Sequence, residues 1–511
     1  MQKRDVDGGR RDPTLTMTMK ACRWTILFSL QCIILLLLQR HCVGFSPEYS
    51  RIVRSLSPNA RSTHITARKA AATTQGDENI TDTTSSSSPA MSGCPFECAF
   101  PRYSIDLKSA RRKKESKNGM NLLPTEIVNN LLKPAATIRD WQAKAQVQRL
   151  ASRYPNSRVY VADTDGAAAM GLLWQSAADL IQAANRPAIA AKTLASSVVI
   201  GCNDELLGEN FCEILKWALT HVPDLQSTSL QVEVLPDDKA VRLTRSETTT
   251  IDVDRNKEKS YTAADINKHT QAWVKRVLVK MGICPFTKSV KTSGQGLADV
   301  GVPVGEIAYH TSQATNTIQL LADTWTAIQE FLDAGPEAQS SILLAAPFYD
   351  EDFATWAGPI FCILETTVVA AQVEDQIGVV CFHPLYATPD GSSWPGFGHM
   401  HSVPRLAKWV QQQEQLEQKK KASKGNTGAT NTLSTEEITG TTSLSREDIA
   451  AGGAWQRRTP HATINVLRAD QLARAEGRRD SATLYPRNIR ALLAVGNEKL
   501  QADLNRERTL S

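Results

Sequence analysis

The stretch Gly282-Ile283-Cys284-Pro285-Phe286-Thr287-Lys288 decides how the second half of the chain is interpreted. It follows residues 264–281, whose apolar positions recur every three or four residues and predict one amphipathic helix. Gly282 is expected to end that helix, because glycine accepts the left-handed backbone conformation common after a helix. Pro285 blocks further helix and favours an extended backbone at Cys284. The sequence thus predicts a thiol and an ammonium group, four residues apart, on a stiff loop.

Beyond this loop, helix-like and strand-like patterns alternate. Strands are expected at 302–309, 341–346 and 376–383, and helices at 317–332, 350–372 (with a break at Gly358-Pro359), 403–421 and 490–500. This alternation predicts an α/β or α+β domain over residues 262–496, with a layered sheet covered by helices.

Residues 138–240 predict a smaller α/β unit upstream, in which the alternation favours parallel strands. Its first predicted strand ends at Asp163 and Asp165, which resemble the aspartate pair of haloacid-dehalogenase phosphatases. The Ser or Thr expected two residues after the second Asp is absent, because Ala167 stands there. The other interpretation is an acidic turn that caps the following helix.

Several short motifs occur in one order. They are Trp273, the Cys284–Lys288 run, Phe382-His383-Pro384, Arg458-Thr459-Pro460, Val466-Leu467-Arg468 and Pro486-Arg487-Asn488. In that order they resemble the bacterial domain-of-unknown-function family fourteen-fifteen, whose members read CPFAK, FHP, NRSP, HLLR and a late RN. The resemblance covers roughly residues 262–496, and it implies a domain and candidate residues without a reaction.

The chain departs from the family pattern at two places. Asn465 stands where the pattern usually has His before Leu-Leu-Arg, and His461 lies four residues earlier as a conceivable substitute. Some 70 residues also separate His383 from Arg458, where the bacterial pattern has a short loop. An acid, base or metal ligand at position 465 would therefore be missing here.

Cys284 and His383 are the candidate catalytic residues. A nearby ammonium group such as Lys288 would lower the pKa of the thiol, and the thiolate is its reactive form. His383 follows an apolar strand, and ligands usually bind at the carboxyl ends of strands in open sheets. Paired in space they would form a nucleophile and base. The alternative is a buried structural cysteine and a histidine whose hydrogen bonds are all made at a strand end.

A group of basic and amide side chains on the motifs is predicted to hold an anion. Lys288, Arg458 and Arg468, with Asn488, are the candidate substrate-binding residues. Arginine suits carboxylate and phosphate groups because its donors form a fixed planar fork. Surface solubility explains Arg457 readily, and it explains the arginines on motif positions less well. His399-Met400-His401 is too small a set to assign a metal site, and no cofactor follows from the sequence.

The N-terminus predicts targeting. The apolar run at residues 24–38 is too short for a comfortable membrane span, so residues 1–44 are expected to be a signal peptide. Residues 45–75 hold five basic residues and one acidic residue and are rich in Ser, Thr and Ala, which is typical of a transit peptide. Residues 45–91 are therefore expected to be a transit peptide and a disordered linker. The arrangement resembles the bipartite plastid presequences of algae with secondary plastids, and it implies a plastid location. Secretion or a signal anchor in a membrane is the alternative.

The rest of the chain constrains its partners. Residues 1–91 hold 12 of the 58 basic and 7 of the 53 acidic residues, which leaves 46 of each. No nucleic-acid binding is therefore expected from net charge, and no stable membrane span is expected after cleavage. Residues 92–137 predict a linker with a basic run, and 422–446 a disordered insertion.

Two functions remain open at this stage. The first is a plastid enzyme that acts on a small anionic metabolite through Cys284 and His383. The second is a non-catalytic ligand-binding or assembly protein that uses the same residues in a pocket or a packed core. Thiol reactivity across pH would separate the two, because an activated thiolate has a pKa well below about 8.5.

Overall fold

The computed structural model describes residues 105, 107, 141–162, 165–184, 196–245, 261–391, 397–424, 443–477 and 481–510, all within one unit, Thr63–Ser511. The predicted signal peptide, transit peptide and most of the 92–137 linker lie outside these residues. Residues 425–442 of the predicted insertion also lie outside them.

The first sheet has the order β1-β2-β4-β3, built from β1 (Arg158–Val161), β2 (Ser197–Gly201), β3 (Leu230–Leu235) and β4 (Ala240–Arg245). β1 and β2 are parallel, whereas β4 is antiparallel to both β2 and β3. The three predicted strands, β1, β2 and β3, do run in one direction, but the sheet is not wholly parallel, because β4 was not predicted and lies antiparallel between β2 and β3. The short Pro236–Asp238 turn fixes the direction of β4, because strands joined by so tight a turn must run in opposite directions.

The second sheet has the order β5-β6-β7-β9-β8. Its strands are β5 (Thr292–Ser293), β6 (Gly305–Thr311), β7 (Gln339–Ala345), β8 (Ile377–Phe382) and β9 (Thr463–Arg468). β6 and β7 are parallel, and β9 is antiparallel to both of its neighbours. The sequence patterns did not predict β9. It places the Val466-Leu467-Arg468 motif in the interior of the sheet.

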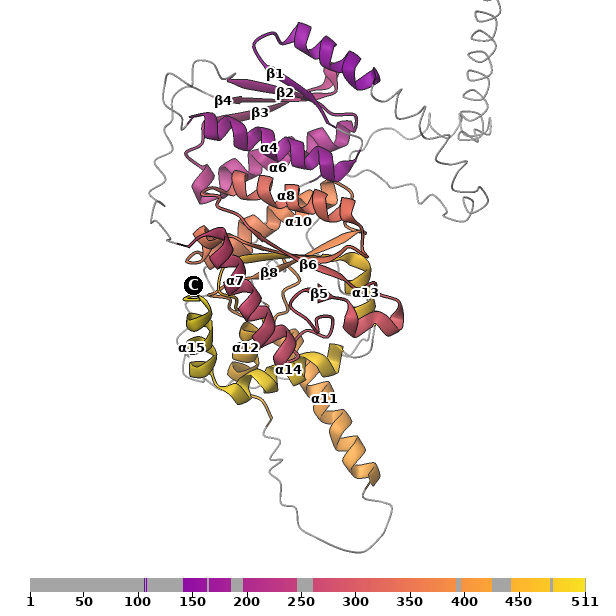
Figure 1. Cartoon of the computed structure of the whole chain (residues 1–511), viewed down its shortest axis with the longest axis vertical. Helices are drawn as coiled ribbons and strands as arrows, with labels where there is room; N and C mark the ends of the chain where they lie inside the picture. Colours follow the sequence, from indigo (N-terminus) through magenta and orange to yellow (C-terminus); the bar gives the residue numbers. More distant parts are fainter. Residues whose placement is uncertain are drawn as a thin grey trace, which may run out of the picture. The chain divides into compact units, whose positions relative to one another are not determined.

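One face of this second sheet packs on a mostly apolar layer of helices. α8 (Thr317–Ala334) and α10 (Phe361–Ala370) cover this face and share one hydrophobic core with α4 (Gly166–Ala184) and α6 (Glu205–His221), so these helices lie between the two sheets (Figure 1). Asp224 joins the two halves, because its carboxylate accepts the backbone N–H of Thr317 at 2.7 Å. The predicted α/β or α+β fold class is confirmed by these layers.

The other face carries a separate hydrophobic cluster. It is covered by α7 (Ala263–Trp273), a π-helical turn (Val274–Lys280), α12 (Arg446–Trp455), α14 (Ser481–Val495) and α15 (Asn497–Glu507). The predicted helix at 490–500 is two helices, because Gly496 adopts a positive φ of 88° between them. α13 (Ala469–Gly477) follows β9 directly.

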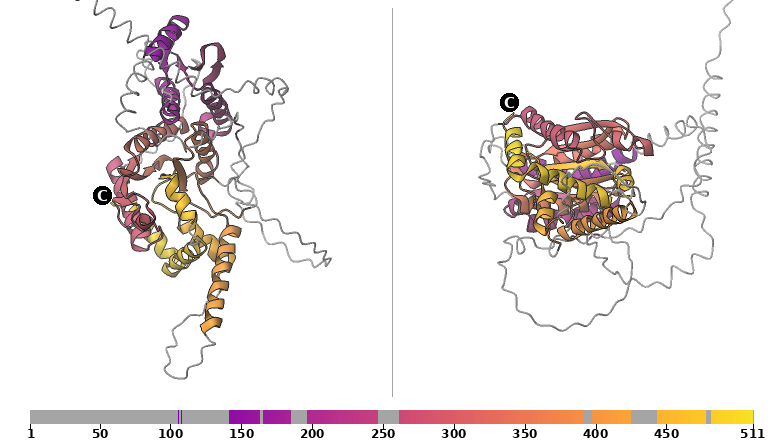
Figure 2. Two further views of the ribbon diagram at one scale, coloured as in Figure 1. Left: turned by 90° about the vertical axis from the view of Figure 1, so that its right-hand side faces the viewer. Right: turned by 90° about the horizontal axis from the view of Figure 1, so that it is seen from below.

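The helix α11 (Val403–Lys424) packs on this side only through its first half. Val403, Leu406 and Val410 are buried against α12 and α14, while the far end projects beyond them (Figure 2). Among the described side chains of its far half, Leu416 is an exposed large apolar residue.

Among the described residues, one segment is long and apolar enough to cross a membrane by length and composition. It is Phe353–Ala370, which comprises α9 (Phe353–Thr355), a π-helical turn (Trp356–Ile360) and α10. This window is 78% buried inside the protein, which is typical of a core helix.

Candidate functional site

The loop after α7 is held in place by the last sequence motif. Gly282 has a φ of 65° and ends the helical segment, as its sequence position predicts. The side-chain amide of Asn488 donates to the Ile283 carbonyl at 2.8 Å, and Arg487 donates to the Gly282 carbonyl at 2.9 Å. Two residues some 205 positions later thus clamp the loop that presents Cys284.

Cys284 lies among hydrogen-bond donors and is half-buried beside the loop. The Thr287 hydroxyl donates to its Sγ at 3.4 Å, and the backbone N–H groups of Phe286 and Thr287 also face it. Burial nevertheless raises the pKa of the Cys284 thiol, and these donors and Lys288 offset the increase only in part. A thiol with a raised pKa is protonated at neutral pH and is a weak nucleophile.

A cavity of about 170 Å³ lies beside Cys284, on the face of the sheet opposite α8 and α10. Alternate residues of four strands form its floor, because side chains on one face of a strand recur every second position. These are Ile307, Ser341, Leu343, Val380, Phe382, Asn465 and Leu467. We call this space the Cys284 cavity. Its walls are mostly apolar, with a few polar groups, which is typical of a small-molecule site.

Ser341 and Asn465 are the polar exceptions on this floor. The Ser341 hydroxyl donates to Asn465 Oδ1 at 3.0 Å. Position 465 is the place where the family pattern usually has His, and it lines the same cavity as Cys284. One of the two departures from the family pattern therefore lies in this cavity, because an amide takes the place of the imidazole.

A tight turn carries two other histidines to the cavity. Gly398 and His399 both have positive φ values, 64° and 53°, and the Met400 N–H donates to the Phe397 carbonyl at 3.3 Å. Positive φ at both central positions is the signature of a type I′ turn. His399 and, beyond the turn, His401 line the cavity.

The environment of these histidines is electropositive. Burial is the main cause that lowers the pKa of His399 to about 4 and of His401 to about 2, and Arg457 and Arg405 lower both further. Arg457 itself lines the cavity, donates to the His399 carbonyl at 3.1 Å and lies 5.2 Å from the Phe382 ring centre. No Asp or Glu is among the described residues that line this space.

The predicted site residues are not all brought together. Cys284 and Asn488 line the cavity, whereas Lys288, His383, Arg458 and Arg468 are not among its lining residues. Lys288 is exposed, because the loop that buries Thr287 turns the next side chain outward.

His383 is fully buried, and both of its ring nitrogens are occupied. Its Nε2 donates to the Tyr349 carbonyl at 2.8 Å, and its Nδ1 accepts the Leu385 N–H at 3.0 Å. Burial lowers the pKa of His383 to about 4. The structure therefore does not join His383 to Cys284 in a dyad, and its contacts are those of a histidine that fixes a strand end.

The two predicted arginines bind backbone carbonyls. Arg458 donates to the Tyr386 carbonyl at 3.1 Å and stacks on Trp455, and burial lowers its pKa. Arg468 donates to the carbonyls of Phe331 and Gln339 at 2.5 and 3.1 Å. Arg457, which the sequence assigned most readily to the surface, is the arginine that reaches the cavity. Only its place one residue before the Arg458-Thr459-Pro460 motif pointed to it.

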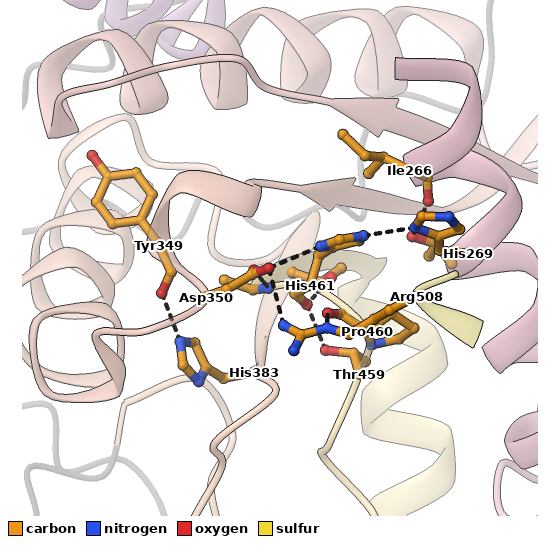
Figure 3. A network of polar contacts seen from close by, with 12 residues as sticks. Ile266, His269, Tyr349, Asp350, His383, Thr459, Pro460, His461 and Arg508 are labelled. Carbon is orange, nitrogen blue, oxygen red and sulfur yellow. Dashed lines mark hydrogen bonds and ion pairs between the residues drawn. The ribbon is translucent and has the colours of Figure 1, made fainter. Parts of the chain in front are cut away.

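A second polar cluster was not predicted from the sequence. His269 Nε2 donates to the Leu510 carbonyl at 2.8 Å, His269 Nδ1 lies 3.0 Å from His461 Nε2, and His461 Nδ1 lies 2.9 Å from Asp350 (Figure 3). Arg508 also donates to Asp350, at 3.1 Å. We call these four side chains the histidine network.

The hydrogen bonds join the members of the network in one chain. The Leu510 carbonyl only accepts, so His269 Nε2 carries hydrogen. One hydrogen bond of 3.0 Å joins His269 Nδ1 and His461 Nε2. Asp350 accepts the Ala462 N–H and Arg508, and it also faces His461 Nδ1. Burial is the main cause that lowers the pKa of His269.

No group of three or more His, Cys, Asp or Glu side chains suited to a metal ion is present among the described residues. His399 and His401 line the same cavity but are separated by the turn, and no third ligand joins them in the described part of the chain.

The structure is an α/β domain with a mostly apolar cavity on one face of its second sheet. Residues 265–394 match the family described as Protein of unknown function (DUF1415), which is the family that the motifs indicated. The match includes the Cys284 loop and the Phe382-His383-Pro384 motif. No curated protein and no solved structure shows a significant match to the chain.

Proposed function

We propose that the domain binds a small anionic molecule in the Cys284 cavity. One observation carries the proposal: a cavity of about 170 Å³ is lined by apolar side chains from four strands and by a single arginine, Arg457, without a carboxylate among its described lining residues. Apolar walls with a few placed polar groups favour binding of a small organic molecule.

The charge of the ligand follows from Arg457. One nitrogen of the Arg457 guanidinium donates to the His399 carbonyl. No acidic group among the described residues forms an ion pair with Arg457. A guanidinium with remaining donors binds carboxylate or phosphate strongly, whereas an ammonium ligand would be repelled. This proposal gives Arg457 the role that Arg458 and Arg468 have in the sequence-based hypothesis.

Ligand-induced stabilisation of the full chain tests the proposal. Hexanoate and hexyl phosphate are expected to raise the melting temperature, by an amount that grows with the logarithm of their concentration above the Kd, and hexylamine is not. Arg457→Gln should abolish the shift. Arg458→Gln is the matched control, because Arg458 contacts the Tyr386 carbonyl and does not line the cavity. Equal shifts with the amine, or an unchanged shift in Arg457→Gln, would contradict the proposal.

Catalysis at Cys284 is the second candidate function. The donors that favour it are the Thr287 hydroxyl and the N–H groups of Phe286 and Thr287, which would stabilise a thiolate once water is displaced. The raised pKa of the thiol opposes it in the free protein. The rate of Cys284 alkylation by iodoacetamide, measured across pH, distinguishes the two functions. A midpoint of this pH profile well below about 8.5, with or without ligand, supports catalysis. A midpoint above that value in both states leaves binding as the function.

We also propose that the protein acts inside a plastid. The composition of residues 1–44 and 45–91 supports this location. A fluorescent protein fused behind residues 1–91 should reach the plastid interior, and the Phe45→Ala version should stop before it. Secretion of the unchanged fusion would overturn the proposal.

A further inference from the structure

Asn465 occupies a position where a polar side chain needs a reason. It lies in the middle of β9, paired with Leu343 on β7 and with Val380 on β8. Both neighbours are buried and apolar, and both line the Cys284 cavity. An amide side chain between buried apolar neighbours loses its hydrogen bonds to water. Its burial costs free energy unless other partners replace those hydrogen bonds.

Only one end of this amide is satisfied by the protein. The Ser341 hydroxyl donates to Oδ1 at 3.0 Å, which orients the side chain and leaves Nδ2 as the group with donors to offer. No hydrogen-bond partner for Nδ2 occurs among the described residues, although only 9% of Asn465 is exposed. The structure therefore presents an oriented donor on the floor of the cavity.

Arg457 and this amide lie over neighbouring positions of one sheet face. Arg457 stacks above Phe382, and Phe382 follows Val380, the partner of Asn465, by two residues on β8. Diagonal neighbours across two strands are about 7–8 Å apart. Asn465 and Phe382 are such neighbours, and the guanidinium lies 5.2 Å from the Phe382 ring centre. A molecule that meets both donors therefore needs two oxygen acceptors that are several atoms apart.

We propose that Asn465 is a ligand-binding residue of the Cys284 cavity and that it selects short-chain oxo-carboxylates. The carboxylate lies at Arg457, and the carbonyl oxygen accepts from Asn465 Nδ2. This inference rests on the proposed function, because it names the class of ligand for the same cavity. It also gives the departure from the family pattern a chemical meaning. An imidazole at position 465 would donate or accept, whereas the oriented amide nitrogen only donates.

A matched series of ligands tests the inference on the full chain. Hexanoate is compared with the 2-oxo, 4-oxo and 5-oxo hexanoates by calorimetric titration. At least one oxo acid should bind about 5- to 10-fold more tightly than hexanoate, the gain of one buried hydrogen bond. Asn465→Asp and Asn465→Leu should each erase that preference. Asn505→Asp, an exposed change on α15, is the control and should retain it.

Two variants are used so that the test stands if one of them does not fold. Circular dichroism of each variant without ligand shows whether it is folded. A preference that persists in either folded variant would overturn the role of Asn465. If hexanoate binds through Arg457 and no oxo acid binds more tightly, this inference fails while the proposed function stands. If none of the acids binds, both fail.

Discussion

The histidine network and the Cys284 cavity lie on the same side of the second sheet, yet they treat polar groups in opposite ways. In the network, every polar side chain has a partner, and Asp350 alone accepts from His461, Arg508 and the Ala462 N–H. In the cavity, Arg457 has no acidic partner among the described residues and Asn465 keeps an amide nitrogen unused. A closed network stabilises a fold, whereas donors without partners in a cavity indicate a ligand.

The largest expected effect tests whether the histidine network stabilises the fold, and it is a substitution of Asp350. Asp350→Asn is expected to destabilise the protein by about 3–5 kcal/mol, because it leaves Arg508 and the His461 ring without the buried carboxylate that they contact. Chemical denaturation of the full chain measures the change. Glu498→Gln, at an exposed position of α15, serves as control and should change stability by less than about 0.5 kcal/mol. A similarly small change in Asp350→Asn would mean that the network is not structural.

Acid should weaken the protein through its neutral buried histidines. Burial lowers the pKa of His383 and of His399 to about 4, below the ordinary value of about 6.5. The unfolded chain binds more protons between these values, so stability falls as pH falls from about 6.5 towards 4. For His383 the full effect is on the order of 3 kcal/mol.

Denaturation midpoints between pH 7 and 4 measure this loss. His383→Gln should unfold at lower denaturant concentration at pH 7 but show a shallower pH dependence. An identical pH dependence in that variant would show that His383 is not the group that titrates.

The hydrogen bond from Asn488 to the Cys284 loop is expected to affect both the stability of the protein and the access of reagents to Cys284. Asn488→Leu removes the donor to the Ile283 carbonyl and should cost about 1–3 kcal/mol. Because the loop then moves more freely, the rate of Cys284 alkylation should rise at constant pH. Mass spectrometry of the labelled chain reads this rate. Slower labelling would mean that the clamp opens the cavity rather than closing it.

The smallest effect is expected at Cys284 itself. Cys284→Ser should change stability by less than about 1 kcal/mol, because the side chain borders a cavity and is partly exposed. Cys381→Ser is the matched contrast, since that thiol is fully buried in the opposite, tightly packed face and should cost about 1–3 kcal/mol. Equal costs would remove the distinction between the two faces of the sheet.

The sequence by itself predicted the elements whose signals are local. Periodicity indicated the helix before Gly282, and the glycine ended it because a positive φ is a property of that one residue. The strand at 376–383 and the helix at 317–332 were likewise found near β8 and α8. Short motifs in one order were enough to indicate the family over residues 265–394.

Tertiary structure decided which of these residues meet. β9 was not predicted, although its residues alternate between polar and apolar from Thr463 to Val466. The alternation spans four residues, which is the shortest run from which a strand can be predicted. His383, Arg458 and Arg468 stand on motifs but bind backbone carbonyls or a backbone N–H, and Arg457 reaches the cavity instead. Which way a side chain points depends on strand register and on partners more than a hundred residues away. A local sequence pattern contains neither the strand register nor these distant partners. The Cys284 cavity and the histidine network could therefore be found only in the folded chain.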